Sequence, residues 1–244
     1  MSNGGDAADQ YRSAVRTTSL ALAVSFVDRV TGGAPTTVRG DRPTGWFEEG
    51  SFRSRRTADG YDVFLEIPPG EPTLSVDAGD RFFAPTDPVV VTEEVLSAPY
   101  PVLEVPLEPT PAYEFDAGTT LVRGVLRGPA PTPDSETPGT PIAEATVKLV
   151  GPEPATGDRT EVQTTTTSAE GEFVLYLPGD GGWTVDTEGD DPLVKVADED
   201  PHILVESGGT TSVSPAVELR ESKTTAVSLT LDGGSLSVDR VLVR

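Results

Sequence analysis

The sequence predicts an all-β protein built from two tandem β-sandwiches. Its 244 residues exceed the roughly 100 residues of one sandwich and fit two. The 25 glycines and 23 prolines favour turns and oppose helix interiors, which indicates short strands joined by tight turns. An internal repeat of turn, strand, turn and strand gives both halves of the chain the same plan.

The first predicted elements are a polar arm at residues 1–16 and a strand after it. The larger apolar residues of this strand alternate with small or polar ones: Leu20, Leu22, Val24 and Phe26. The stretch has no small-x-small cleavage site, so we interpret it as a strand and not as a signal peptide. No stretch reaches the roughly 20 apolar residues that cross a bilayer. We therefore expect no membrane insertion, and a location in the cytoplasm or in a particle assembled there.

The internal repeat covers residues 57–77 and 168–186. In each copy a turn ends in a glycine, Gly60 or Gly171, which we expect to adopt the positive φ that a Cβ resists. The strand that follows is stopped in each copy by proline and glycine: Pro68-Pro69-Gly70 and Pro178-Gly179.

The strand after each turn alternates, and its larger apolar residues are expected to face the core. In the first copy these residues are Tyr61, Val63, Leu65 and Ile67. In the second copy they are Phe173, Leu175 and Leu177. The next strand is expected to resume the inward face with Leu74 and Val76, or with Trp183 and Val185.

Residues 120–190 contain three notable motifs: Pro141-Ile-Ala-Glu-Ala-Thr-Val-Lys-Leu149, Ala169-Glu-Gly-Glu-Phe-Val-Leu175 and Leu177-Pro-Gly179. With these motifs, the segment resembles the carboxypeptidase regulatory-like domain, a prealbumin-like sandwich of about seven strands. Residues 20–80 match more loosely. The resemblance implies two tandem immunoglobulin/prealbumin-like β-sandwiches, and it carries no catalytic residues to transfer.

The predicted division is a first sandwich at 17–108, a proline-rich linker at 109–119, and a second sandwich with extra C-terminal strands at 120–244. Tyr113 and Phe115 in the linker are expected to pack against the sandwiches and are candidate interface residues. This layout resembles that of accessory structural proteins from the contractile, phage-tail-like injection systems of haloarchaea.

The last apolar run, residues 235–244, is more strand than one sandwich needs. Either it closes its own sheet, or it adds to the sheet edge of a neighbouring subunit with Val241 and Val243 in the interface. Both alternatives are open from the sequence.

The net charge of −22 is typical of proteins adapted to high salt, where ions screen self-repulsion. Only three of the 18 basic residues are lysines: Lys148, Lys195 and Lys223. The single dense basic run, at residues 53–56, is interpreted as a solvated strand edge. Nucleic acid is therefore not an expected partner, because phosphate binding needs clustered basic residues.

The sequence favours a protein that is not an enzyme. There is no cysteine, and His202 is the only histidine, so zinc hydrolase chemistry and a Ser-His-acid triad are both disfavoured. The weak calcium candidates are Asp186, Glu188, Asp190 and Asp191, whose spacing does not fit an EF-hand. We interpret them as a solvated acidic loop and expect no cofactor.

Two pairs of adjacent aromatics, Trp46-Phe47 and Phe82-Phe83, place one ring on each face of a strand. Trp46 and Phe82 are therefore candidates for an exposed ring that anchors an interface or stacks on a sugar. Packing in the core or between domains is the alternative.

We expect a structural subunit of a large assembly, specifically a contractile injection particle, in which it acts as adaptor, cap, baseplate or fibre component. Its partners would be other protein subunits. The alternative is a carbohydrate- or cell-surface-binding module. A third possibility, regulation of a peptidase, depends on the family resemblance alone.

Overall fold

The computed structural model describes residues 20–36, 42–49, 52–132, 137–153, 159–179, 181–187 and 191–244. The predicted arm at residues 1–16 lies outside them. Within the described residues the chain is strand and loop with one short helix, α1 (Glu93–Leu96), which confirms the all-β sandwich class. No described helix is long and apolar enough to cross a membrane.

The chain forms two compact units that are interleaved in sequence. The first comprises Met1–Val27, Pro43–Asp77 and Pro85–Val105, and the second comprises Asp28–Arg42, Ala78–Ala84 and Pro106–Arg244. Residues 28–42 and 78–84, which we had expected in the first sandwich, therefore group with the second unit. The physical reason is an aromatic cluster around Tyr113, described below, which draws both segments together.

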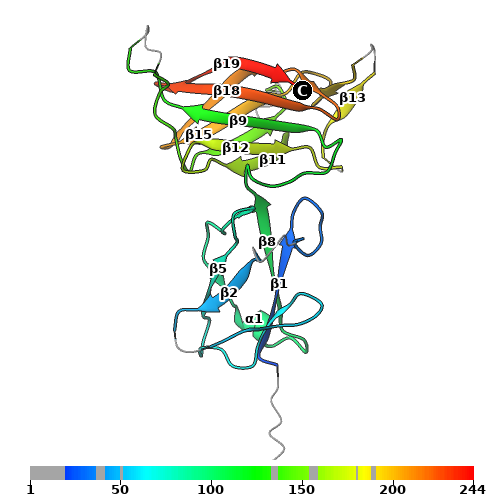
Figure 1. Cartoon of the computed structure of the whole chain (residues 1–244), viewed down its shortest axis with the longest axis vertical. Helices are drawn as coiled ribbons and strands as arrows, with labels where there is room; N and C mark the ends of the chain where they lie inside the picture. Colours follow the sequence, from blue (N-terminus) through cyan, green and yellow to red (C-terminus); the bar gives the residue numbers. More distant parts are fainter. Residues whose placement is uncertain are drawn as a thin grey trace, which may run out of the picture. The chain divides into compact units, whose positions relative to one another are not determined.

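Two small sheets make up the first unit (Figure 1). One sheet has the order β3 (Arg55–Arg56), β4 (Asp62–Phe64), β1 (Leu22–Asp28), β8 (Val102–Pro109). The other has the order β2 (Thr44–Phe47), β5 (Thr73–Asp77), β7 (Val89–Val90). The rings of Phe47 and Phe64 meet edge to face with centroids 5.0 Å apart, so side chains from both sheets share one core.

The expected alternation of β1 is confirmed in its centre. Leu22, Val24 and Phe26 are buried, while Leu20, which precedes the strand, is exposed. Of the basic run at residues 53–56, Arg55 and Arg56 form β3 at the edge of the sheet, as predicted. Arg55 is exposed, but Arg56 is half-buried by its ion pair with Asp62, so it is not a solvated residue.

The turn glycines of the repeat behave as predicted, since Gly60 has φ +90° and Gly171 has φ +74°. The predicted inward face is correct in the second copy, where Phe173, Leu175 and Leu177 are all buried. The repeat therefore places its turns, and one of its two strands, correctly.

The predicted inward face of the first copy is wrong. Tyr61 and Leu65 are exposed, whereas Asp62 and Phe64 are buried. Asp62 occupies an inward position because Arg56 Nε lies 2.8 Å from its Oδ1 and forms a part-buried ion pair with it. A hydrophobicity pattern cannot show an inward aspartate whose partner lies on the neighbouring strand.

The second unit is a sandwich of two four-stranded sheets (Figure 1). One has the order β12 (Glu172–Tyr176), β9 (Leu121–Arg127), β18 (Thr224–Asp232), β19 (Ser235–Val243). The other has the order β11 (Glu161–Thr166), β10 (Thr146–Val150), β15 (His202–Ser207), β16 (Thr210–Ala216). A three-stranded sheet joins β13 (Thr184–Asp186), β14 (Leu193–Lys195) and β17 (Leu219–Arg220).

The inner faces of these sheets form one core. Its largest buried members include Leu126, Leu149, Phe173, Ile203 and Leu229. Most neighbouring strands are antiparallel, but β9 and β18 run parallel at the centre of their sheet. Strand β6 (Phe82–Phe83) pairs with the end of β8 and is the fifth strand of the sheet that contains β3, β4, β1 and β8. Both β6 and the part of β8 from Pro106 onward belong to the second unit.

Candidate functional site

The best candidate for an interaction surface is the edge strand β19. It pairs antiparallel with β18 from Asp232↔Ser235 to Thr225↔Val243. It is the last strand in the order of its sheet, so its outer edge has no partner among the described residues. An unpaired edge exposes backbone donors and acceptors that another strand can bind.

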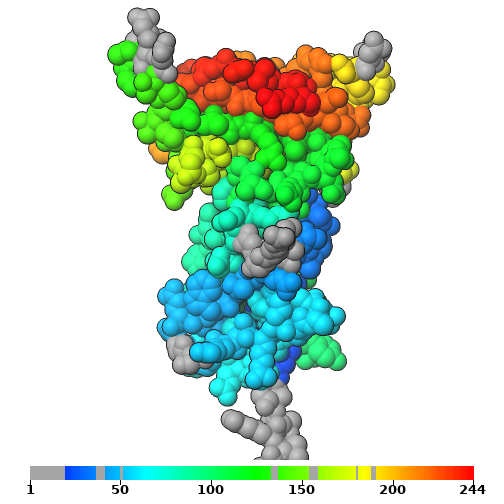
Figure 2. Space-filling model, viewed as in Figure 1, coloured from blue at the N-terminus to red at the C-terminus, as the bar shows by residue number. Residues whose placement is uncertain are grey.

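The apolar side chains at the end of β19 are exposed. Val241 is 44% exposed, and Leu242 and Val243 are each 37% exposed, whereas Leu236 near the start of the strand is buried. In Figure 2 the red end of the chain spreads over the surface of the second unit. The surface thus combines an open strand edge with three adjacent apolar residues.

The two valines lie on the core-facing side of the sheet. Val241 is opposite Val227 and Val243 is opposite Thr225, and residues opposite each other in an antiparallel pair point to the same face. Val227 and Thr225 are buried, but their partners on β19 are not. The core therefore ends before β19 does, which leaves apolar side chains that a further strand or loop would cover.

The features that prevent unwanted pairing of a sheet edge are confined to the part of β19 before Val241. A register shift between Ser228 and Leu229 interrupts the ladder opposite Asp239, and Asp239 is held by the Thr230 hydroxyl at 2.5 Å. Charges and bulges of this kind protect sheet edges. Beyond Arg240 the strand is apolar as far as Val243, so this end is the part most suited to pairing.

The linker residues Tyr113 and Phe115 form an aromatic cluster in the second unit. Ring centroids are 5.4 Å apart between Phe82 and Tyr113, 4.7 Å between Tyr113 and Phe115, and 5.8 Å between Phe115 and Tyr176. Phe82 is only 4% exposed, so the expectation of an exposed ring at Phe82 is wrong. It is buried because Tyr113 covers it.

A buried carboxylate holds this cluster in place. Asp28 is fully buried and accepts hydrogen bonds from the Tyr113 hydroxyl at 2.6 Å and from the Val30 N–H at 2.8 Å. Burial, and then the hydrogen bond to Asp28, raise the pKa of Tyr113. Tyr113 is therefore a neutral donor at physiological pH, which is the state that a buried aspartate requires.

Arginines complete the cluster. The guanidinium of Arg81 lies 4.9 Å from the centre of the Tyr113 ring, and that of Arg123 lies 5.5 Å from the centre of the Phe115 ring. Arg123 also donates to the backbone carbonyls of Pro111 and Tyr113. These contacts fix residues 111–115 on strand β9, so the segment is a packed part of the second unit.

Tyr176 and Glu108 lie beside the cluster. Burial raises the pKa of Tyr176 to about 12, and its hydroxyl donates to the Arg29 carbonyl at 3.1 Å. Burial also raises the pKa of Glu108, and Arg29, 3.1 Å away, opposes this effect. Every group here has a structural partner, which favours a packing role for the cluster.

Trp46 lies in the first unit and is 43% exposed, while its neighbour Phe47 is buried. The pair therefore divides between the faces of β2 as the sequence predicts. Trp46 is the accessible ring.

The remaining chemical candidates have ordinary surroundings. The Nδ1 atom of His202 lies 2.8 Å from the Ser214 carbonyl oxygen, and because a carbonyl only accepts, this nitrogen carries the proton. Of the calcium candidates, Asp191 forms an ion pair with Arg220, and Glu188 and Asp190 lie outside the described residues. Among the described residues, no three His, Cys, Asp or Glu side chains gather in a way that could hold a metal ion.

The sequence interpretation missed Asp28, Arg123 and Leu242. Asp28 carried a signal, because it continues the alternation of Val24 and Phe26 on the inward face. Arg123 and Leu242 carried none, because their roles depend on which strand lies beside them.

No family model and no curated protein sequence matches the chain. Solved structures with some likeness include transthyretin from Sparus aurata, at 14% identity and a TM-score of 0.26, over 51% of this chain and 96% of that one. A putative cell adhesion protein from Bacteroides ovatus has 10% identity and a TM-score of 0.29, over 94% of this chain and 98% of that one. At these low values neither structure indicates a function or a partner for this chain.

Proposed function

We propose that this chain is a non-enzymatic structural subunit of a larger protein assembly, which it joins by strand addition at β19. The observation that carries the proposal is the unpaired outer edge of β19, which ends in the exposed residues Val241, Leu242 and Val243. A neighbouring strand that paired there would extend the sheet through backbone hydrogen bonds and would cover these side chains.

The kind of assembly that we propose is a contractile, phage-tail-like injection particle, with this chain as adaptor, cap, baseplate or fibre component. The support is the layout of the sequence, in which a proline-rich joint leads into a regulatory-like sandwich. Sedimentation of an extract of the producing cells in high salt would find the chain in a fast-moving particle. Recovery of free monomer alone would contradict the proposal.

A charge on the open edge tests the surface itself. We expect Val241→Lys to remove the chain from the particle, because a lysine on an edge strand opposes pairing with a second strand. The matched control is Val90→Lys, which places the same charge on β7, an edge strand of the first unit where Val90 is 40% exposed. Equal loss in both variants, or in neither, would contradict a role for β19.

A carbohydrate-binding module is the second candidate, and the exposure of Trp46 favours it. A flat aromatic ring in water is the group that stacks on a sugar. In that case a glycan array would show binding that Trp46→Ala abolishes, while Tyr100→Ala, at a ring that is 82% exposed, would leave it unchanged.

A further inference from the structure

The first unit contains a pocket of about 380 Å³ on the sheet of β2 and β5. Its lining residues are Phe47, Glu48, Glu49, Pro68, Pro69, Glu71, Pro72, Thr73 and Ser75. Pockets for small ligands have volumes of about 300–1,000 Å³, so this one is at the small end of the range. It is suited to a single side chain and not to a large ligand.

The walls of the pocket are of two kinds. Three proline rings and the Phe47 ring give it an apolar floor, and the other lining side chains are carboxylates and hydroxyls. The lining residues that the structure describes include no lysine, arginine, histidine or amide side chain. A ligand that fits must therefore be apolar along its length and must donate hydrogen bonds at its end.

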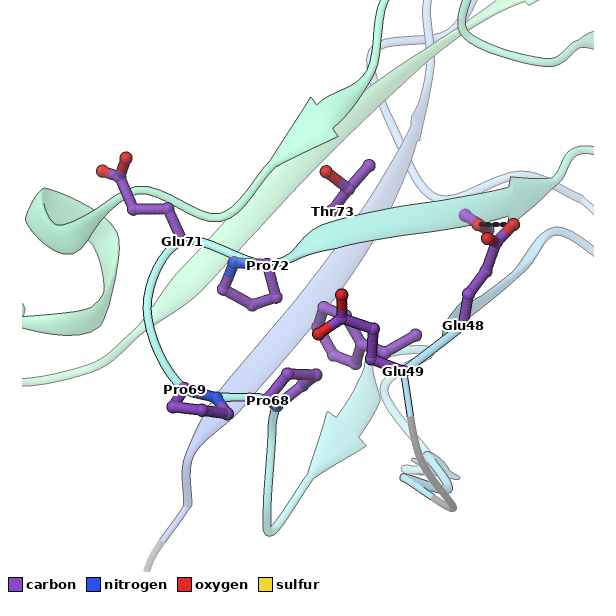
Figure 3. A pocket seen from close by; sticks show the side chains of 9 residues that line it. Glu48, Glu49, Pro68, Pro69, Glu71, Pro72 and Thr73 are labelled. Atoms are coloured by element: carbon purple, nitrogen blue, oxygen red, sulfur yellow. Dashed lines mark hydrogen bonds between the residues drawn. The ribbon is translucent and has the colours of Figure 1, made fainter.

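The three carboxylates of the pocket differ in whether they already accept a hydrogen bond from the chain. Glu71 accepts the Glu93 N–H at 3.2 Å, and Figure 3 shows its carboxylate directed away from the prolines. Glu48 Oε1 accepts the Ser75 hydroxyl at 3.2 Å, and Figure 3 shows the Glu48 carboxylate turned toward Ser75 and away from the prolines. Glu49 has no hydrogen bond or ion pair with any described residue, and its carboxylate points toward the side of the pocket formed by Pro68 and Pro72 (Figure 3).

The exposed residue Trp46 is on β2, the strand that supplies Phe47 to the pocket and leads into Glu48 and Glu49. Trp46 and Ser75 are directly opposite in the register of β2 and β5, so both side chains project from the same face of the sheet. Ser75 lines the pocket. A cation that entered would meet the Glu49 carboxylate beside the proline rings.

We propose that this pocket binds an arginine side chain of a partner protein. The aliphatic stem would lie on the prolines, since long basic side chains cover apolar surface while their charged end stays polar. The planar guanidinium would donate two N–H groups to the two oxygens of the Glu49 carboxylate, which faces the prolines (Figure 3). The pocket is in the first unit and β19 is in the second, so each proposal is tested by variants that leave the other surface unchanged.

Other ligand classes fit the walls less well. Three carboxylates repel an anion. A neutral sugar is bound through both donors and acceptors, and among the described lining residues only the Thr73 and Ser75 hydroxyls are side-chain donors. Lysine is a compact point charge without the planar fork that matches the two oxygens of one carboxylate.

The test is an NMR titration of the full chain with acetyl-Gly-Arg-Gly-amide, at a salt concentration of about 0.1 M that limits long-range attraction. The indole N–H of Trp46 and the backbone amides of Glu49 and Ser75 report on the pocket. We expect saturable shifts at these positions. We expect the same peptide with citrulline, which has the shape of arginine without its charge, to give none.

Variants separate the pocket from the general acidity of the chain. We expect Glu49→Gln to weaken binding about tenfold, because a hydrogen bond to a charged group changes an equilibrium constant by about that factor. Glu104→Gln removes the same charge from an exposed position on β8 of the same unit and is expected to leave affinity unchanged. Equal weakening by both variants would show diffuse attraction and would overturn the proposal.

Three further outcomes also overturn it. These are the absence of saturable shifts with the arginine peptide, equal shifts with the citrulline peptide, and shifts produced by cellobiose but not by arginine. The citrulline comparison uses the unmodified chain, so it decides the question even if a variant does not fold.

Discussion

Two buried aspartates show how single residues set the packing of this protein. Asp28 and Asp62 both occupy inward positions on strands and are almost completely buried. Each is tolerated because a specific partner reaches it, the Tyr113 hydroxyl in one case and the Arg56 guanidinium in the other. A buried carboxylate without such a partner would be strongly destabilising.

Removing the Tyr113 hydroxyl tests this interpretation. We expect Tyr113→Phe to lower the free energy of unfolding by about 1–3 kcal/mol, because the variant leaves Asp28 Oδ2 buried without its donor. Urea denaturation followed by circular dichroism measures the change. The matched control, Tyr100→Phe at a residue that is 82% exposed, is expected to have almost no effect. Equal stabilities for the two variants would contradict a structural role for the bond.

Of the hydrogen-bonded residues Asp28 and Tyr113, only the burial of Asp28 could be predicted from the sequence. Asp28 continues the alternation that places Val24 and Phe26 inside, so its burial follows from period two. Its partner lies 85 residues away, and no local pattern connects the two positions. The same limit applies to Asp62. It faces inward, opposite to the predicted face of its strand, because its partner Arg56 is on the neighbouring strand.

Strand β9 shows the importance of one small residue within an element. It lies between β12 and β18 at the centre of its sheet, and Gly124 is in its middle. A Cβ built there would lie 2.3 Å from the ring of Phe173 and 2.7 Å from Val227. The absence of a side chain at this position lets two core residues from the neighbouring strands approach the backbone.

We therefore expect Gly124→Ala to destabilise the second unit by about 1–3 kcal/mol, because overpacking in a close-packed core forces side chains off their rotamers. Thermal unfolding measures the effect as a lower melting temperature. Gly179→Ala is the control, because Gly179 has nothing within 4 Å of the added Cβ and no positive φ. A stable Gly124→Ala variant would contradict the close approach of Phe173.

The positions of strands in the sequence were easier to predict than the pairing between strands. Alternation located β1, and the glycine turns located the strands of the repeat. The parallel pairing of β9 with β18 brings together residues about a hundred positions apart, Thr224↔Leu121 among them. Periodicity says which residues share a face, but it does not say which strand lies alongside.

The whole molecule carries a net charge of −22, which acts on stability without any single contact. Repulsion among like charges opposes the compact state, and salt shortens its range to about 10 Å at 0.1 M and about 3 Å at 1 M.

We expect the melting temperature to rise by several degrees between about 0.1 M and about 1 M KCl, because screening reduces this repulsion. Differential scanning calorimetry at both concentrations measures the shift. NaCl is expected to give the same rise, since screening depends on ionic strength and not on the identity of the cation. A melting temperature that stays constant or falls would contradict the charge-based explanation.

The sequence by itself determined the fold class, the turn glycines, the alternation of β1 and the inward face of β12, because these depend on residues close together in the chain. Only the tertiary structure decided that residues 28–42 and 78–84 join the second unit, that Phe82 is buried while Trp46 is exposed, and that β19 lies at an open edge. Each of these outcomes depends on contacts between distant segments. Such contacts are selected by the burial of shared surface, which no local pattern encodes.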